Sequence, residues 1–493
     1  MAGSTTLIVL LVIGCFISLI GVALIPVANK VIDDMVVDQI VLKNGSTGYE
    51  NWIDAPVPVY IQFWVWDCIN SLEVMKGEKP YFVQKGPYSY REYWPKENIT
   101  FYDNHTISYT APKTYVFEPS MSVGDPLEDK FTTLNVPLMT IVNLLQYESG
   151  PINGILALIM EIIGYDTFLT LSVHDILWGY EDPLLKLAHE LNLMPSSYFG
   201  FYAGKNNTDD GEYVIYSGED EVKKVNKIVS YKGQRSLDFW SDKYANMLNG
   251  TDGSLNPPFL KKDQKLWLFS SDICRSAYLI LDKQYKYKNI KLYRYVVPPE
   301  LYANVSVNPD NAGFCTPTVA NCLPGGLLNG SNCQQNAPVV FSLPHFLYAD
   351  ADVLEMVGGM EPKKEEHQIL FDAEPLTGAS LFVAKRIQIN IYTRPFPDIP
   401  FLKNFPKTYF PIMWLNESAS ATDKVVKDFK DKVQVPQKAA TAVEYGLLAI
   451  GLILVITMTM ILVKRRKVTQ PCKLSINKND ADETSPLLKD QTA

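Results

Sequence analysis

Two long runs of apolar residues that carry no charge constrain this chain more than any other feature. Residues 7–27 read LIVLLVIGCFISLIGVALIPV, and residues 445–463 read YGLLAIGLILVITMTMILV. A helix rises about 1.5 Å per residue, so either run is long enough to cross a hydrocarbon core about 30 Å thick. Because the core helices of soluble proteins rarely stay uncharged over this length, we interpret both runs as transmembrane helices.

The charges beside these runs predict the orientation of the chain in the membrane. Four basic residues directly follow the second run, and such a cluster stays on the cytosolic side; they are Lys464, Arg465, Arg466 and Lys467. The first run is longer than the ~7–15 apolar residues of a signal peptide and its leader MAGSTT has no positive charge, which favours an uncleaved anchor over a cleaved signal peptide. The predicted order along the chain is a cytosolic N-terminus, a helix, a luminal domain, a second helix and a cytosolic tail: 1–6, 7–27, 28–440, 445–463 and 464–493.

Glycosylation sequons support the same topology. Eight N-x-S/T sequons all fall between the two apolar runs, and they begin at Asn44, Asn98, Asn104, Asn206, Asn249, Asn304, Asn329 and Asn416. A single sequon is weak evidence because the pattern is short. Eight sequons confined to one side of the predicted membrane indicate a heavily glycosylated luminal or extracellular surface.

The composition permits a large folded luminal domain. Roughly 400 residues separate the two spans, which is enough for one large domain or two fused lobes. The 12% aromatic and 47% hydrophobic residues suffice for a packed core, and the formal net charge of −9 argues against a general binder of nucleic acids or anionic lipids. The basic pairs Lys223/Lys224 and Lys261/Lys262 are interpreted as solvated surface.

The seven cysteines divide by compartment. Cys15 lies in the first predicted span, and Cys472 lies in the tail, close enough to the bilayer to be a candidate for palmitoylation. Cys274, Cys315, Cys322 and Cys333 crowd one stretch of an oxidising compartment, where disulfides persist. Four cysteines allow three pairings; the short loop CTPTVANC favours a local Cys315–Cys322 bridge without deciding the set. Cys68 is expected to be an unpaired, buried thiol.

The luminal sequence favours an α+β fold built on antiparallel strands. Five β-rich stretches recur, separated by turn signals such as KGPYS, NGTDGS, LPGG and PLTG, and the stretches are VPVYIQFWVW, GEYVIYSG, KLWLF, NIKLYRYVV and AKRIQINIYT. This order predicts a large antiparallel sheet or barrel rather than βαβ units. Residues 136–193 instead have helical spacing, and the part at 151–165 (PINGILALIMEIIGY) is apolar nearly all round. A helix of that kind is either buried or covered by a partner.

No motif starts an argument for catalysis or for a cofactor. The chain has no H-E-x-x-H zinc pair, no phosphate loop and no G-x-S-x-G nucleophile elbow. Its five histidines are scattered, without a close pair at metal-ligand spacing: His105, His174, His189, His345 and His367. We therefore expect no enzyme activity, no catalytic residue, no metal and no cofactor.

A series of luminal landmarks resembles the class B scavenger receptor family. Eight segments carry the resemblance in order between the two anchors: KGPYSYRE (85–92), VHDILWGYEDPLL (173–185), NGTDG (249–253), SDICRS (271–276), NAGFC (311–315), PHFLYAD (344–350), PLTG (375–378) and KRIQIN (385–390). The resemblance implies a luminal antiparallel β-barrel with short helices, an apical helical bundle at about 136–193, and an apolar tunnel leading toward the bilayer. It also implies the disulfides Cys274–Cys333 and Cys315–Cys322.

The C-terminal tail favours the lysosomal branch of that family. Glu483, Leu487 and Leu488 form an acidic dileucine signal of the type [D/E]-x-x-x-L-[L/I], preceded by Asp482. Pro486 disfavours helix, so the segment stays extended, with the leucines available to an apolar pocket of a clathrin adaptor complex. Such a signal is an address read by a receptor. It predicts residence in the lysosomal or late endosomal membrane.

The resemblance implies a lysosomal receptor and lipid conduit. Family relatives escort a lysosomal hydrolase through their apical helices and pass cholesterol or other lipids along the tunnel, so luminal sterols, phospholipids or fatty acids are the expected ligands. The corresponding contact strip in this chain is Ile155, Leu158, Ile159, Ile162 and Ile163. The lysosomal relative has a pH-sensing histidine in this region, whereas residues 140–170 contain none. That difference weakens the expectation of enzyme escort more than that of lipid handling.

Two alternatives stay open. One is a cell-surface class B scavenger receptor for lipid or lipoprotein uptake, for which the lysosomal pool is merely a recycling destination. The other is a structural glycoprotein whose sugar coat protects the lysosomal membrane.

Overall fold

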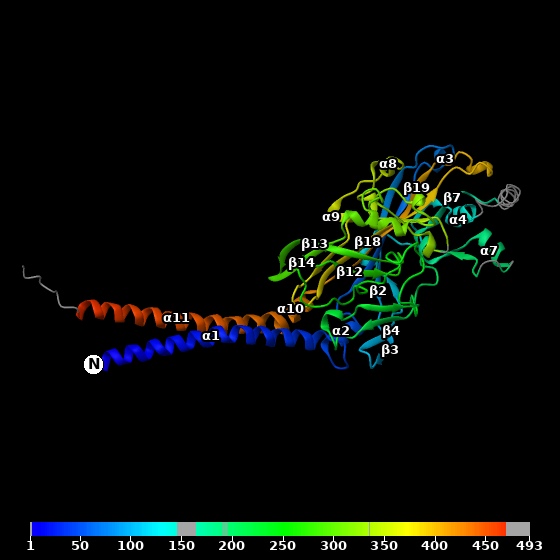
Figure 1. Cartoon of the computed structure of the whole chain (residues 1–493). Helices are drawn as coiled ribbons and strands as arrows, with labels where there is room; N and C mark the ends of the chain where they lie inside the picture. Colours follow the sequence, from blue (N-terminus) through cyan, green and yellow to red (C-terminus); the bar gives the residue numbers. More distant parts are fainter. Residues whose placement is uncertain (1, 145–163, 191, 193–194, 335, 470–493) are drawn as a thin grey trace, which may run out of the picture. The chain divides into compact units, whose positions relative to one another are not determined.

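The computed structural model describes residues 2–144, 164–190, 192, 195–334 and 336–469 of the 493-residue chain. Clustering of contacts divides the chain into two compact units. The terminal unit consists of residues 1–32 and 435–493, and the central unit of residues 33–434. Figure 1 shows the helices and strands with the labels used below.

The terminal unit contains the two predicted spans. α1 (Ala2–Ile40) is one continuous helix that includes residues 7–27 and continues into the central unit, and α11 (Val435–Thr469) includes residues 445–463. Both helices are long and apolar enough to cross a membrane. They pack closely through small residues: a Cβ on Gly21 of α1 would lie 2.8 Å from the backbone nitrogen of Leu448 in α11. Small residues allow this approach between membrane helices.

The central unit is built on a large antiparallel sheet (Figure 1). Among the described residues eleven strands form it, nine of them in the order β12-β13-β14-β17-β18-β19-β1-β2-β5, while β15 pairs with β16 and β16 with β18. The bounds are β1 (Val59–Cys68), β2 (Phe82–Tyr93), β5 (Thr114–Phe117), β12 (Leu266–Ser270), β13 (Arg275–Tyr287), β14 (Ile290–Val296), β15 (Leu327–Asn329), β16 (Val339–Ser342), β17 (Leu370–Ala373), β18 (Ser380–Thr393) and β19 (Thr408–Ser420).

The predicted mixed fold with a large antiparallel sheet is confirmed, whereas the barrel is not. The strand order of the described residues is open, with β12 and β5 at its two ends. The five β-rich stretches of the sequence correspond to β1, β10, β12, β14 and β18. Apolar side chains of β1 and β18 enter the main core together with those of β2, β16 and β19. Those of β10, β12 and β14 lie in smaller apolar clusters.

Smaller strand groups accompany the large sheet. Four further strands form a sheet in the order β11-β10-β4-β3, and two separate pairs are β6 with β7 and β8 with β9. The bounds are β3 (Glu97–Tyr102), β4 (Thr106–Thr110), β6 (Lys130–Leu134), β7 (Phe168–Ser172), β8 (Tyr180–Glu181), β9 (Tyr198–Phe199), β10 (Tyr213–Tyr216) and β11 (Ile228–Tyr231).

Short helices connect the strands. The α-helices of the central unit are α2 (Thr47–Ile53), α3 (Ser71–Val74), α4 (Val136–Leu144), α6 (Val173–Trp178), α7 (Pro183–Glu190), α8 (Ala351–Glu355), α9 (Lys364–His367) and α10 (Asp423–Phe429), which a π-helical turn, η10 (Lys430–Gln434), follows. The 3-10 turns are η1 (Pro119–Met121), η3 (Val222–Lys224), η4 (Pro299–Leu301), η5 (Pro309–Phe314), η6 (Val319–Asn321), η7 (Ser331–Cys333), η8 (Pro344–Phe346) and η9 (Pro400–Leu402).

Two local predictions change in the structure. The helical stretch at 136–193 holds α4, α6 and α7, but also β7 and β8, which its apolar pattern did not reveal. The turn predicted at KGPYS is wrong, because these residues lie inside β2. Gly86 there has φ of 137° opposite a register shift in β1, and a Cβ would lie 2.7 Å from the carbonyl oxygen of Phe63. The glycine therefore serves a bulge within a strand.

Candidate functional site

A cavity of about 530 Å³ lies within the central unit. The large sheet contributes residues of β1, β12, β13 and β15 to β19 to its wall. Other residues come from the end of α1, α2, α10, η10, β4 and β10 and from loops. On β18 Val383, Lys385 and Ile387 line it, follow the alternation of a strand and so share one face, and Ser380 lines it at the start of the strand. Most of the wall is apolar, as expected of a pocket for an apolar ligand.

One group of charged side chains on and behind this wall forms a network. Lys385 on β18 lies directly opposite Glu417 on β19, with 3.0 Å between its Nζ and Glu417 Oε2. Lys385 also forms an ion pair with Asp272, in the turn between β12 and β13. Lys113, just before β5, lies 3.0 Å from Glu92 Oε1 on β2. These five residues, here called the ionic network, come from distant parts of the sequence.

Burial and mutual attraction shift the acidic pKa values of the network in opposite directions. Burial raises the pKa of Glu92 to about 7, although Lys113 opposes the shift. Within the described residues neither carboxylate oxygen of Glu92 has an aligned hydrogen bond, which agrees with this direction. The ammonium of Lys385 lowers the pKa of Asp272. Burial opposes ionisation of Glu417, but Lys385 and Lys113 outweigh it and lower its pKa.

A second buried pair lies on the cavity wall, and its carboxylate accepts several hydrogen bonds. Lys96 Nζ lies 3.7 Å from Asp252 Oδ2 and 4.0 Å from the ring centre of Trp94. Tyr109 and Asn226 donate hydrogen bonds of 2.9 and 2.8 Å to the Asp252 carboxylate. A buried pair with this many partners joins strands and loops, so we assign it a structural role.

Two buried histidines stack outside the cavity. The rings of His345 and His367 have centroids 4.2 Å apart and planes at 13°. His345 Nδ1 accepts from the amide of Glu361 at 3.0 Å, and His367 Nδ1 accepts from the amide of Lys363 at 3.0 Å. Burial is the first cause that lowers their pKa values, to about 3 for His345 and about 4 for His367. Both rings are therefore neutral at the pH of 5–6 at which ordinary histidines become charged.

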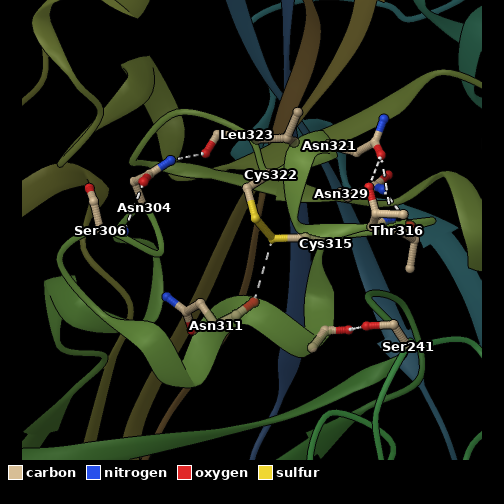
Figure 2. The surroundings of a disulfide bond; sticks show 12 residues. Ser241, Asn304, Ser306, Asn311, Cys315, Thr316, Asn321, Cys322, Leu323 and Asn329 are labelled. Atoms are coloured by element: carbon tan, nitrogen blue, oxygen red, sulfur yellow. Dashed lines mark hydrogen bonds between the residues drawn. A yellow bond between two sulfur atoms is a disulfide. The ribbon is translucent and has the colours of Figure 1, made fainter.

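The structure contains one of the two predicted disulfides. Cys315 and Cys322 are bonded across the CTPTVANC loop (Figure 2). Cys274 and Cys333 are free thiols instead of the expected bridge, but they share one apolar cluster with Trp240, and a hydrogen bond between them is the first cause that raises the pKa of Cys274. The two thiols lie close enough to interact, so the Cys274–Cys333 disulfide stays a prediction. Cys68 is free and buried, as expected.

The predicted glycosylation sites fall into two groups. Four side chains are exposed and accessible to a glycan, namely Asn44, Asn98, Asn104 and Asn206. The others are half-buried, namely Asn249, Asn304, Asn329 and Asn416. Figure 2 shows Asn304 and Asn329 near the disulfide, where their Nδ2 atoms donate to Leu323 O at 2.9 Å and Thr316 Oγ1 at 3.0 Å. Occupancy of all eight stays a prediction.

Several predicted sites lie outside the described residues. These are the apical strip (Ile155, Leu158, Ile159, Ile162 and Ile163), the sorting signal (Glu483, Leu487 and Leu488) and Cys472. In the part of the chain that the structure describes, no three His, Cys, Asp or Glu side chains are placed to hold a metal ion.

Comparison with known proteins decides the family. A family model described as the CD36 family matches residues 12–462, which is most of the chain. The chain belongs to the CD36 family. Lysosome membrane protein 2 of Homo sapiens is 38% identical over 464 residues, which is 94% of each chain, and that of Mus musculus is 37% identical over the same shares. Scavenger receptor class B member 1 of Sus scrofa is 31% identical over 446 residues, covering 90% of this chain and 86% of the relative.

Membership of the CD36 family confirms the resemblance found in the sequence. The names of the relatives describe receptors and membrane proteins, which points to a family without enzyme activity. Sequence reasoning missed the ionic network and the histidine pair. A signal was present for Lys385, Asp272 and His345, because each lies in a family landmark. Their contacts, however, join separate segments: Lys385 lies 113 positions from Asp272 and 32 from Glu417, and no local pattern reveals such contacts.

Proposed function

We propose that this CD36-family protein is a membrane receptor and lipid conduit of the lysosomal membrane, and that its cavity is the lipid site. The cavity is the observation that carries the proposal. Its volume of about 530 Å³ falls within the range of about 300–1,000 Å³ typical of small-ligand sites. Its wall is mostly apolar, so a sterol, a fatty acid or the chain of a phospholipid gains the free energy of apolar burial there.

Chain connectivity supports delivery between the cavity and a bilayer. The lining includes Val36 and Ile40, which follow the first span, and Lys432 and Val433, which precede the second. The wall is thus built partly from the segments next to both spans. A lipid conduit needs this connection, whereas a sealed structural domain does not.

A substitution that fills the cavity with a larger side chain tests the lipid proposal. Ala419 on β19 lines the cavity, and Ser420, the next residue on the same strand, is exposed and does not. The full-length protein is purified from its own cell type, and bound lipids are identified by mass spectrometry. We expect lipid in the wild type and in S420F, and its loss in A419F. Equal lipid recovery from A419F and S420F would contradict the assignment of the cavity.

The location and orientation rest on the relatives and on the sequence. The lysosomal membrane is proposed because two relatives are named lysosome membrane proteins and because the tail carries the dileucine signal. Cytosolic termini follow from the basic cluster after residue 463. The variant L487A/L488A removes the leucines that clathrin adaptors recognise, so it should redistribute the protein to the cell surface. An unchanged distribution would favour the alternative, a cell-surface scavenger receptor, which the similarity to scavenger receptor class B member 1 supports.

Escort of a lysosomal hydrolase is the finer part of the proposal. It is supported by the similarity to lysosome membrane protein 2 and by the apolar strip at 155–163. Affinity purification of the full chain at neutral and acidic pH, followed by mass spectrometry, tests it. A hydrolase held at neutral pH and lost in acid would establish escort. Lipid without hydrolase at either pH would leave a lipid conduit alone.

A further inference from the structure

The ionic network has one cation whose partner is hidden from the cavity. Lys113 and Lys385 line the cavity and keep 23% and 26% of their side-chain surface exposed. Asp272 and Glu417 line it too, with 48% and 15% exposed. Glu92 is 0% exposed and lies behind Lys113. A ligand in the cavity can therefore reach the ammonium of Lys113 but not the carboxylate that neutralises it.

The position of Lys113 is fixed by its backbone and its neighbours. Its amide donates to Thr208 O at 3.0 Å, and its carbonyl accepts from Asn207 N at 2.7 Å. Its Nζ lies 5.2 Å from the ring centre of Trp94. Among the described residues Glu92 is the ion-pair partner of Lys113, whereas Lys385 has two, Asp272 and Glu417.

We propose that Lys113 binds the anionic headgroup of a single-chain amphiphile whose tail occupies the cavity, and that protonation of Glu92 in acid frees Lys113 for this role. The inference rests on the proposed lipid function and assigns its headgroup chemistry and its control by pH. At neutral pH and above, the carboxylate of Glu92 competes with the ligand for the ammonium. In acid, a proton from solvent neutralises Glu92, and the charge of Lys113 remains for the ligand.

The charge balance of the network explains why the ligand is anionic. With Glu92 ionised, three carboxylates face two ammonium groups, and an added anion is repelled. With Glu92 protonated the network is neutral, and Lys113, which loses its ionised partner, lies on the cavity wall. The charged and titratable groups that interact with Glu92 from the surrounding elements are Lys113, Tyr115 on β5, Lys385 on β18 and Glu417 on β19.

The expected pH effect follows from the fraction of Glu92 that is protonated. Burial raises the pKa of Glu92 to about 7. That fraction is then about 0.03 at pH 8.5 and about 0.99 at pH 5.0, and an apparent Kd scales inversely with the competent fraction. An anionic amphiphile should therefore bind about 30-fold more tightly at pH 5.0 than at pH 8.5.

Labelled hexadecyl sulfonate tests the proposal because it stays ionised over this pH range. The full chain is reconstituted in nanodiscs, and binding is measured against empty nanodiscs. Hexadecanol, which has the same tail and no charge, is the matched probe. We expect the 30-fold effect for the sulfonate in the wild type, and tight binding at both pH values in E92Q. Hexadecanol binding should change with neither pH nor variant.

A double variant separates the headgroup from the fold. E92Q/K113Q removes both charges together, so it leaves no unpaired buried ion, and it should lose the sulfonate while keeping hexadecanol. A pH effect that persists in E92Q, or sulfonate binding that survives in E92Q/K113Q, would overturn the headgroup assignment. If hexadecanol does not bind the wild type, the proposed lipid site itself is refuted. This outcome distinguishes failure of the lipid function from failure of the headgroup assignment.

Two natural headgroup chemistries are compared in E92Q at pH 8.5, where both are ionised. Palmitate represents a carboxylate, and hexadecyl phosphate represents a phosphate. If palmitate or hexadecyl phosphate binds more tightly than hexadecanol, the headgroup site is supported, and the tighter of the two identifies the headgroup chemistry. Equal binding of all three would overturn it.

Discussion

Replacement of the stacked histidine pair should change how the stability of the central unit depends on pH. In the folded protein the pKa of His345 is lowered to about 3 and that of His367 to about 4, first by burial and then by charges that include Lys363 and Arg386. The ordinary value is 6.5. The unfolded chain therefore binds more protons than the folded protein below pH 6.5, and stability falls as the pH decreases through that value.

The magnitude follows from the distance between 6.5 and the final pH. At pH 5.0 an unfolded histidine is charged, while both folded rings are still largely neutral. At about 1.36 kcal/mol per pH unit, over about 1.5 pH units, each histidine costs about 2 kcal/mol, and the pair costs about 4 kcal/mol. This loss is a large share of the typical stability of a folded domain.

The double variant H345N/H367N removes the titration while preserving the local geometry. Asparagine places an acceptor near the position of Nδ1, and it tolerates the φ of 55° at position 345. Urea unfolding of the full chain in detergent, followed by tryptophan fluorescence at pH 7.5 and 5.0, gives the free energy of unfolding. The wild type should lose about 4 kcal/mol more than the double variant between these pH values.

The control is H105N, an exposed histidine that also has a positive φ of 59°. Its free energy of unfolding should change between pH 7.5 and 5.0 as that of the wild type does. If the double variant loses as much stability in acid as the wild type does, the two rings are not held neutral, and the reasoning from burial is refuted.

Three further predictions concern stability. D372N should destabilise the central unit by about 3–5 kcal/mol, because Arg294 donates to both oxygens of Asp372 at 2.7 and 2.6 Å and loses its buried counter-ion. R294K, which keeps the charge but loses the two-oxygen contact, should cost less in the same urea titration. An equal cost would contradict the role of the buried charge and assign the effect to the two-oxygen contact. G86A should lower the melting temperature measured by circular dichroism, since a Cβ at Gly86 meets Phe63 O at 2.7 Å. G45A is the control, because φ is also positive there but a Cβ would have no neighbouring atom within 4 Å. Equal shifts in melting temperature would show that backbone conformation alone is responsible. C315S/C322S should reduce stability by about 2.5 kcal/mol from the entropy of its short loop, and an unchanged midpoint would show that the loop is ordered without the bond.

The sequence alone predicted the features that depend on local composition. Uncharged apolar runs at 7–27 and 445–463 are long enough to cross a membrane, so both spans could be predicted, and so could the five β-rich stretches. The family landmarks are likewise linear. The disulfide Cys315–Cys322 was favoured because only seven positions separate its cysteines.

The tertiary structure decided the features that depend on contacts between distant segments. Glu92, Lys113, Asp272, Lys385 and Glu417 are ordinary charged residues in the sequence, and only the packing of β2, β18, β19 and two loops brings them together, four on the cavity wall and Glu92 behind it. His345 and His367 are 22 positions apart and stack only because η8 and α9 meet. Gly86 looked like a turn residue because its conformational freedom is visible in the sequence, whereas the strand that pairs with it is not. Local patterns carry the preferences of single segments, but burial and charge pairing, which set the pKa values and the proposed ligand site, arise only when the segments are packed together.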